Sequence, residues 1–178
     1  VLMDDVARTA RVSKGTLYRY FPSKGELYLA VMFEGLERLQ ADLRKTVSAE
    51  AAPLAKLELL IRCMLEHFWD RRFFFALIHR NEHKPDDRNN HEWLRRREEL
   101  SRLFQRAVRE AAAAGQLRPL NPRVATEMLL GMLRGANRYR TSHDTLDSTV
   151  AAVFDLFICG AGTTAARRPL AVRNTRER

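Results

Sequence analysis

The chain has 178 residues, of which 46% are hydrophobic and 30% charged, and its formal net charge is +9. This length and composition allow a substantial buried core, so we expect a globular protein. No run of 18 or more apolar residues occurs, and no basic stretch precedes an apolar segment; we therefore expect a cytoplasmic protein with no membrane partner. Residues 1–32 carry five basic against three acidic side chains, a net of +2, so the global charge favours a nucleic-acid partner only weakly.

Two short amphipathic helices are predicted at the start of the chain, over residues 3–10 and 13–21. Ser13 is placed to cap the second helix, in which Leu17 and Phe21 share one inward face. The outward arc of that helix carries hydroxyl, aromatic and basic side chains, which suit phosphates and base edges. Its residues are Lys14, Thr16, Tyr18, Arg19 and Tyr20. A helix, a tight turn and a second helix with a polar basic face predict a helix-turn-helix, whose second helix enters the major groove.

The stretch from Val6 to Leu27, VARTARVSKGTLYRYFPSKGEL, closely resembles the DNA-binding signature of the TetR (tetracycline-repressor-like) family. The resemblance implies base or phosphate contacts from four residues of the second helix: Lys14, Thr16, Tyr18 and Tyr20. It also implies a phosphate contact from Lys24 at the start of the next helix. With the outward basic and capping residues, the expected DNA-binding set is Ser13, Lys14, Thr16, Tyr18, Arg19, Tyr20 and Lys24.

The chain departs from the family pattern at two places. Arg11 stands where family members usually have a glycine, in a turn that often adopts positive φ, at a cost of about 1 kcal/mol. Family members also normally carry another helix ahead of this pair, for which the sequence before Met3 has no room. We therefore expect the chain to bind an operator more weakly than a version extended upstream.

Helical periodicity predicts an all-α fold for the rest of the chain. A long linking helix is expected over 24–47, followed by helices over 54–69, 71–83, 91–114, 122–139 and from 144 or 145 to 160, with a loop at 84–90. The expected organisation is a DNA-binding domain with its linking helix (1–46), a ligand-binding and dimerisation domain (53–162) and a disordered basic tail (163–178).

The last two helices resemble the family's dimerisation pair, which meets its twofold mate as a four-helix bundle. Glycines that allow close backbone approach and an apolar final helix agree with that role. The expected interface residues are Met128, Gly131, Met132, Gly135, Val150, Phe154, Phe157 and Ile158. Packing within one chain only is the alternative, because apolar stripes at helical spacing are often ordinary core.

A small-molecule pocket between the body helices is implied by the same resemblance. Its expected lining is aromatic and apolar, with histidines as polar handles. The candidates are Met64, His67, Phe68, Phe74, Phe75, Ile78, His79, Trp93 and Phe104. For each aromatic residue, a place in the plain hydrophobic core is the competing interpretation.

The motif from His79 to His83, HRNEH, matches a zinc-peptidase pattern in which two histidines bind the metal. Such a site needs a third protein ligand, typically a downstream glutamate, and none occurs between Glu127 and the tail. We therefore expect no metal, no cofactor and no catalytic residue. Cys63 and Cys159 lie in apolar helical patterns and are expected to stay reduced.

The sequence thus predicts a homodimeric, ligand-responsive repressor that binds a palindromic operator. Its partners would be double-stranded DNA, a second copy of the chain and an unidentified small-molecule effector. The alternative is a dimeric helical small-molecule-binding protein with impaired DNA binding because the first helix is absent.

Overall fold

The structure is a computed structural model that describes residues 2–48, 51–71 and 88–162. The named elements in these ranges are all α-helices, which confirms the predicted all-α fold. They are α1 (Met3–Thr9), α2 (Lys14–Tyr20), α3 (Lys24–Ser48), α4 (Pro53–Trp69), α6 (Arg88–Ala113), α7 (Pro122–Tyr139) and α8 (Leu146–Ala161). Most of the predicted helix over 71–83, the start of the predicted loop and the tail from residue 163 lie outside the described residues.

Local sequence chemistry sets most of the helix ends. Asn121 accepts from two backbone N–H groups of the first turn of α7, and Thr145 forms a reciprocal capping box with Ser148 at α8. Gly115 adopts a positive φ of 69° just after α6. The predicted end of the loop over 84–90 was wrong, because α6 already begins at Arg88.

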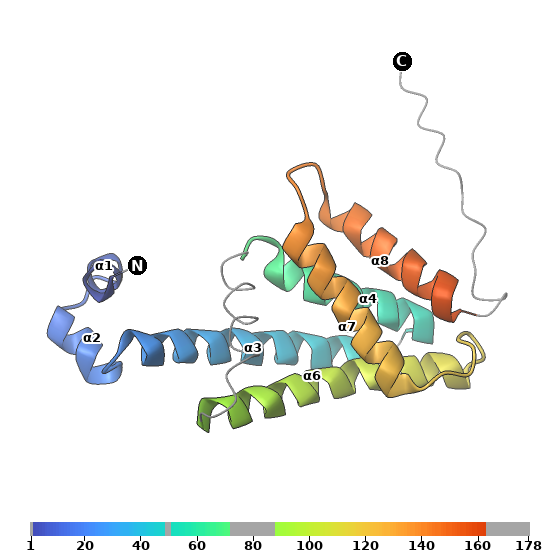
Figure 1. The fold of residues 1–178 in the computed structure, drawn as a ribbon, viewed down its shortest axis with the longest axis horizontal. Helices are drawn as coiled ribbons and strands as arrows, with labels where there is room; N and C mark the ends of the chain where they lie inside the picture. The colour runs from blue at the N-terminus through green and yellow to red at the C-terminus, as the bar shows by residue number, and fades with distance from the viewer. Residues whose placement is uncertain (1, 49–50, 72–87, 163–178) are drawn as a thin grey trace, which may run out of the picture.

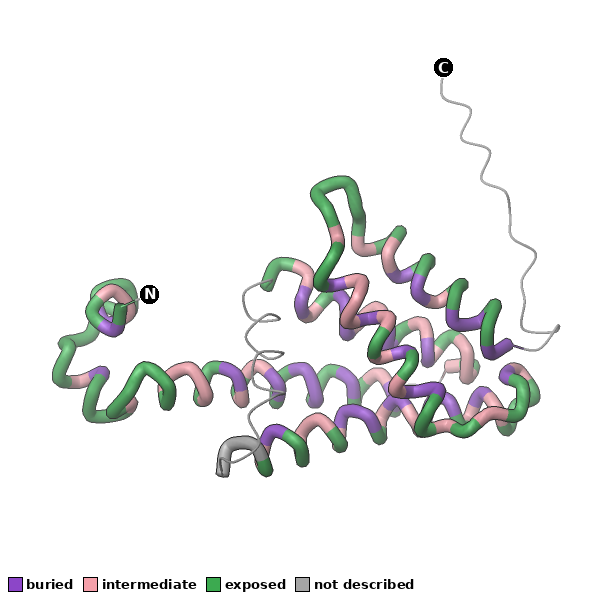
Figure 2. Tube along the Cα trace, in the orientation of Figure 1, coloured by how far each residue is buried: buried purple, intermediate pink, exposed green. Residues whose placement is uncertain are grey.

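The linking helix α3 contributes to two separate hydrophobic cores. Figure 1 shows α1 and α2 at one end of α3, away from the helices of the body. The small core of this head joins Met3, Ala7 and Leu17, with Leu27 packed against it. The large core takes in α3 from Tyr28 onward. The division between the two cores therefore falls inside α3, and most of the linking helix is part of the body (Figure 2).

Helix α4 is the centre of the body, where it packs against α3, α6, α7 and α8. Leu57, Leu60, Ile61 and Leu65 of α4 are fully buried. The α7 and α8 helices lie over it as an antiparallel pair (Figure 1). Among the described helices, none is both long and apolar enough to cross a membrane.

Candidate functional site

The turn between α1 and α2 is held in a left-handed conformation at Arg11. Its φ is 56°, and it is the one non-glycine residue with positive φ among those described. The backbone N–H of Val12 then donates to the carbonyl of Ala7, 3.0 Å away, which closes the end of α1. The predicted positive φ at this position is confirmed, and the turn directs the chain into α2.

Ser13 caps α2, as predicted. Its Oγ accepts from the backbone N–H of Thr16 at 3.0 Å and lies 2.8 Å from the Thr16 hydroxyl. Leu17 faces inward and is 7% exposed, packed with Met3 and Ala7 of α1. Because Leu17 anchors the inner side of α2 to α1, the opposite side of α2 faces solvent.

The outward side of α2 presents the predicted DNA-facing residues. Lys14, Tyr18, Arg19 and Tyr20 are exposed, while Thr16 is half-buried. The guanidinium of Arg19 lies 5.3 Å from the centroid of the Tyr20 ring, and the ammonium of Lys14 lies 6.0 Å from that of Tyr18. This surface combines positive charge with aromatic planes and donors, the chemistry that reads a duplex.

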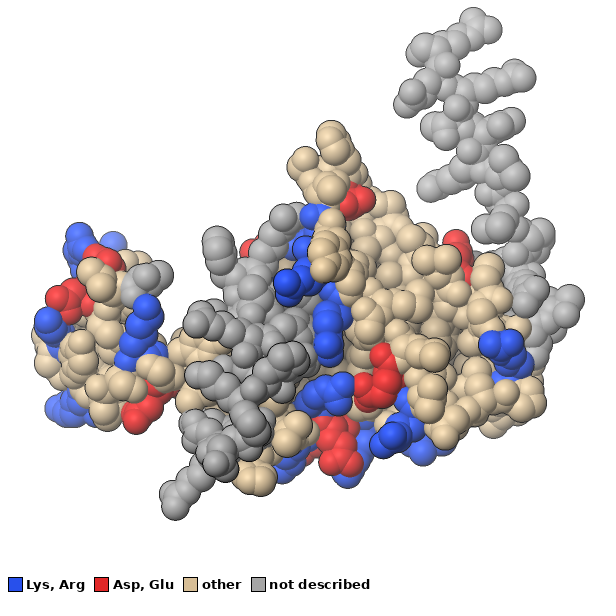
Figure 3. All heavy atoms as spheres, viewed as in Figure 1, with Lys and Arg blue, Asp and Glu red and all other residues tan. Residues whose placement is uncertain are grey.

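Lys24 lies exposed at the first position of α3, directly after the α2 surface. Ser23 accepts from the backbone N–H of Glu26 at 3.2 Å and so begins the helix. On the face shown in Figure 3, Lys and Arg side chains surround the head, with acidic side chains between them.

An acidic side chain of α1, Asp4, contacts the predicted interface directly, and no sequence pattern indicated it. Lys14 Nζ donates to Asp4 Oδ2 of α1 across 3.0 Å. The hydrogen bond and the negative charge of Asp4 raise the pKa of Lys14. The two residues are ten positions apart on different helices, a spacing that no single-helix pattern connects.

The predicted effector pocket is only partly within the described residues. Phe74, Phe75, Ile78 and His79 lie outside them. Met64, Phe68, Trp93 and Phe104 are all buried in the large core, from α4 and α6. Their pocket role stays a prediction.

A groove of about 800 Å³ lies between α3 and α4, and of the predicted pocket residues that the structure describes, only His67 lines it. The lining is mostly charged: Arg38, Asp42, Lys45, Thr46, Leu59, Arg62, Cys63, Glu66, His67, Asp70 and Arg71. Sequence periodicity missed this groove because charged residues at these positions are typical of an ordinary solvated helix face.

Burial controls the ionisation of two groups in the groove. It lowers the pKa of His67 to about 4, with a further contribution from the positive charge of Arg71, so the imidazole is neutral at pH 7. It also raises the pKa of the Cys63 thiol to about 11, helped by the negative charge of Asp42. Cys63 is therefore a protonated thiol at neutral pH, not an activated nucleophile.

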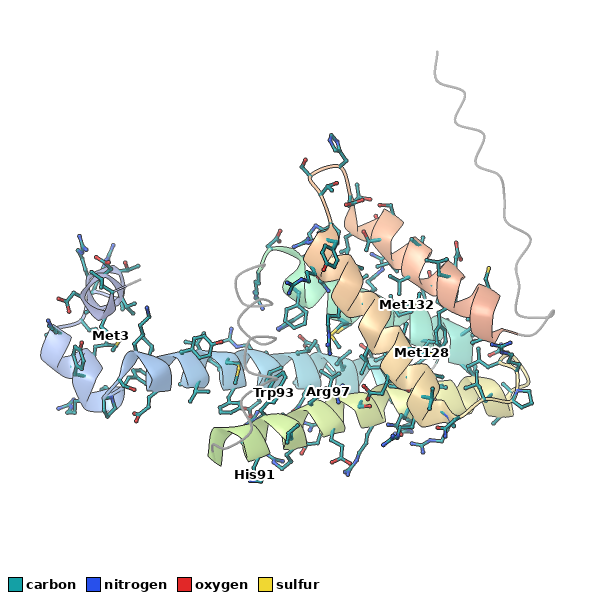
Figure 4. All side chains as sticks on the ribbon, in the orientation of Figure 1. Met3, His91, Trp93, Arg97, Met128 and Met132 are labelled. Carbon is teal, nitrogen blue, oxygen red and sulfur yellow. The ribbon has the colours of Figure 1, made fainter. Side chains whose placement is uncertain are left out.

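The predicted dimer residues divide into two sets. Val150, Phe157 and Ile158 are buried in the core of the single chain, which corrects their assignment to a partner-facing surface. Met128 is 66% exposed, Gly131 is exposed, and Met132, Gly135 and Phe154 are half-buried. Figure 4 shows Met128 and Met132 along α7, and Figure 3 shows a surface over α7 and α8 with few charged side chains.

The α8 side of this surface carries an exposed leucine that sequence reasoning did not select. Leu156 is 67% exposed, on the side of α8 opposite its buried residues. We define the outer face of α7 and α8 by its exposed or half-buried residues Val124, Met128, Gly131, Met132, Gly135 and Leu156. Phe154, two positions from Leu156 on α8, packs against the large core instead.

The described residues hold no group of three or more His, Cys, Asp or Glu side chains that could bind a metal ion. His79 and His83 lie outside the described ranges.

Two family models match the chain. The model of bacterial regulatory proteins of the tetR family matches residues 1–31, and that of the tetracyclin repressor-like C-terminal domain matches residues 50–141. Over 61 residues the chain is 38% identical to the HTH-type transcriptional repressor KstR of Mycolicibacterium smegmatis. That alignment covers 34% of this chain and 30% of the relative, so it spans less than a third of the relative's length.

Solved structures share the fold at lower identity. The regulator PfmR of Thermus thermophilus is 20% identical, with a TM-score of 0.77 over 89% of this chain and 88% of that one. AibR, solved in complex with isovaleryl coenzyme A and operator DNA, is 19% identical, with a TM-score of 0.73 over 88% of this chain and 86% of its own.

Proposed function

The chain belongs to the tetracycline-repressor-like (TetR) family, and from that premise we propose that it is a homodimeric DNA-binding repressor controlled by a small-molecule effector. The observation that carries this proposal is the arrangement of α2. Its inner side is anchored by Leu17, and its outer side presents Lys14, Tyr18 and Tyr20 to solvent. In this role α2 is the recognition helix, and Lys24 binds a phosphate beside it.

The outer face of α7 and α8 supports the dimer. It is apolar, exposed and interrupted by glycines that have no neighbour within 4 Å of an added Cβ. Such a face on one chain is suited to the same face on a second chain, which gives a twofold interface. A twofold dimer presents two recognition helices to a palindrome, with half-sites about 34 to 36 Å apart or multiples of that spacing.

The linking helix supports effector control. From Tyr28 onward α3 shares the large core with α4 and α6, and its other end carries Leu27 of the head core. A ligand that shifts α4 or α6 therefore moves α3 and, with it, the head. The solved relative AibR was captured with an acyl thioester and operator DNA, and we propose an apolar or amphipathic effector for this chain as well. The buried residues Met64, Phe68, Trp93 and Phe104 are the proposed contacts in the body.

The test is selection of duplexes from a random library by the full chain. We expect enrichment of a palindromic sequence whose half-sites are separated by one helical turn or a multiple of it. Enrichment of no sequence, with all duplexes bound alike, would contradict the proposal. An effector screen then uses acyl coenzyme A thioesters of different chain length and scores release of the selected duplex.

A further inference from the structure

The ion pair between Asp4 and Lys14 lies at the edge of the surface that α2 presents to DNA. Lys14 Nζ and Asp4 Oδ2 are 3.0 Å apart, with side chains that are 62% and 58% exposed. Both groups are therefore open to solvent and to a duplex. The pair joins α1 to α2 and places the carboxylate beside the lysine in the folded head.

We propose that Asp4 restrains the contribution of Lys14 to DNA binding, so that Lys14 adds affinity only when a phosphate reaches contact distance. This inference rests on the proposed function of α2 as the recognition helix. It assigns Asp4 as a residue that positions Lys14 and lowers the affinity for non-specific duplexes.

Electrostatics gives the reason. For a phosphate several ångströms away, the charges of Asp4 and Lys14 nearly cancel. Lys14 therefore adds little to the long-range attraction that dominates non-specific binding. An ammonium has three donors, and at contact distance a phosphate can replace or join the carboxylate as an acceptor. An exposed ion pair is weak enough for this exchange. A loosely held duplex therefore gains little from Lys14, and a well-fitted duplex gains a charged hydrogen bond.

The neighbouring residue Asp5 offers a matched control. It lies on the same helix and pairs with Arg8, three residues away, outside the α2 surface. Asp5→Asn removes the same charge from almost the same place and leaves Lys14 paired. A general repulsion between acidic side chains and DNA would affect both variants alike, whereas an effect through Lys14 is confined to Asp4.

The experiment measures the affinity of the full chain for a fixed non-operator duplex and for the selected duplex over a range of salt concentrations. Four variants are compared with the wild type: Asp4→Asn, Asp5→Asn, Lys14→Gln and the double variant Asp4→Asn with Lys14→Gln. For Asp4→Asn we expect about fivefold tighter non-specific binding at low salt. The slope of log K against log salt should steepen by about 0.9, the value for one additional phosphate contact. The selected duplex should gain less, so the ratio of specific to non-specific affinity should fall.

Two results would overturn the inference: equal effects of Asp4→Asn and Asp5→Asn, or an Asp4→Asn effect that persists when Lys14 is Gln. Failure of the proposed function is a different result, namely duplex binding with no preferred sequence, and the salt slopes still decide the role of Asp4 in that case. A readout without DNA checks the pair itself. Titration of the Lys14 ammonium by NMR should give a lower pKa in Asp4→Asn than in the wild type, and an unchanged pKa would contradict the pairing.

Discussion

Ser13 and Thr16 are joined twice at the start of α2, through the backbone N–H of Thr16 and through their two hydroxyls. This connection fixes the first turn of a helix with only seven residues. Short helices depend on their caps and on tertiary contacts, because propagation adds few hydrogen bonds to offset nucleation. The Ser13 cap and the buried Leu17 therefore together hold the surface that we assign to DNA.

The cap makes the first prediction. Ser13→Ala should destabilise α2 by about 1 kcal/mol, seen as faster amide hydrogen exchange in residues 16–20 and weaker binding of the selected duplex. Ser13→Asn should restore protection in α2, since the asparagine side chain accepts the same bond. Equal exchange in the alanine variant and the wild type would show that the cap adds no stability.

The second prediction concerns the hydrogen bonds at the end of α4. The Arg140 guanidinium donates to the carbonyls of Phe68 and Trp69 and lies 4.2 Å from the Trp69 ring centroid. Arg140→Ala should lower the free energy of unfolding in urea by about 1.5 to 3 kcal/mol, because these charged hydrogen bonds satisfy the last turn of α4. Arg140→Lys should not restore it, since an ammonium lacks the planar fork and stacking surface.

Arg138→Ala is the matched control for this prediction. Arg138 is exposed two positions away, with its guanidinium 5.8 Å from the centroid of the neighbouring Tyr139 ring. The variant should leave the free energy of unfolding within about 0.5 kcal/mol of the wild type. A loss equal to that of Arg140→Ala would contradict a specific role for the cap on α4.

Sequence patterns predicted the features that depend on local chemistry. The cap at Ser13 and the positive φ at Arg11 follow from residues a few positions apart, and the structure confirms both. The predictions that failed depend on which side of a helix packs against which neighbouring helix. Helix α8 is so apolar that its sequence did not separate the core residue Phe157 from the exposed Leu156.

Contacts between helices could not be predicted from the sequence either. The pairing of Asp4 with Lys14 and the groove between α3 and α4 arise only when two charged helix faces meet. On each helix alone, the same residues are typical of a solvated surface. The effector contacts could not be separated from plain core for the same reason, since both are buried apolar side chains.

The third prediction concerns the half-buried imidazole of His67. Its pKa of about 4 in the folded protein lies below the ordinary value of 6.5, so between these pH values the unfolded chain binds a proton that the folded chain does not. Stability from this group is fully present above pH 6.5 and falls as the pH drops toward 4. Between pH 7 and 5 the wild type should lose more stability in urea than His67→Gln. Parallel losses in the two proteins would contradict a lowered pKa.

The fourth prediction concerns the dimer interface. A side chain at Gly131 would meet nothing within 4 Å in the single chain, so Gly131→Arg should fold normally. On the outer face of α7 and α8, however, an arginine would separate two copies and bury a charge. We expect the wild type to sediment as a dimer at micromolar concentration and the variant as a monomer.

The control for the dimer is Ala41→Arg, which adds the same side chain at an exposed position of α3. It should remain dimeric. A monomeric wild type, or a dimeric Gly131→Arg variant, would show that the outer face of α7 and α8 is not the interface.

The central claim is that the outer side of α2 reads DNA, and Tyr20 tests it most directly. Tyr20 is 66% exposed under the Arg19 guanidinium, and Tyr139, 76% exposed beside Arg138, repeats this local arrangement at the end of α7. The measurement is the affinity of each alanine variant of the full chain for the selected duplex at one fixed salt concentration. We expect Tyr20→Ala to weaken binding by about tenfold or more and Tyr139→Ala to leave it within about twofold. Equal affinities of Tyr20→Ala and the wild type would contradict the assignment of α2 as the recognition helix.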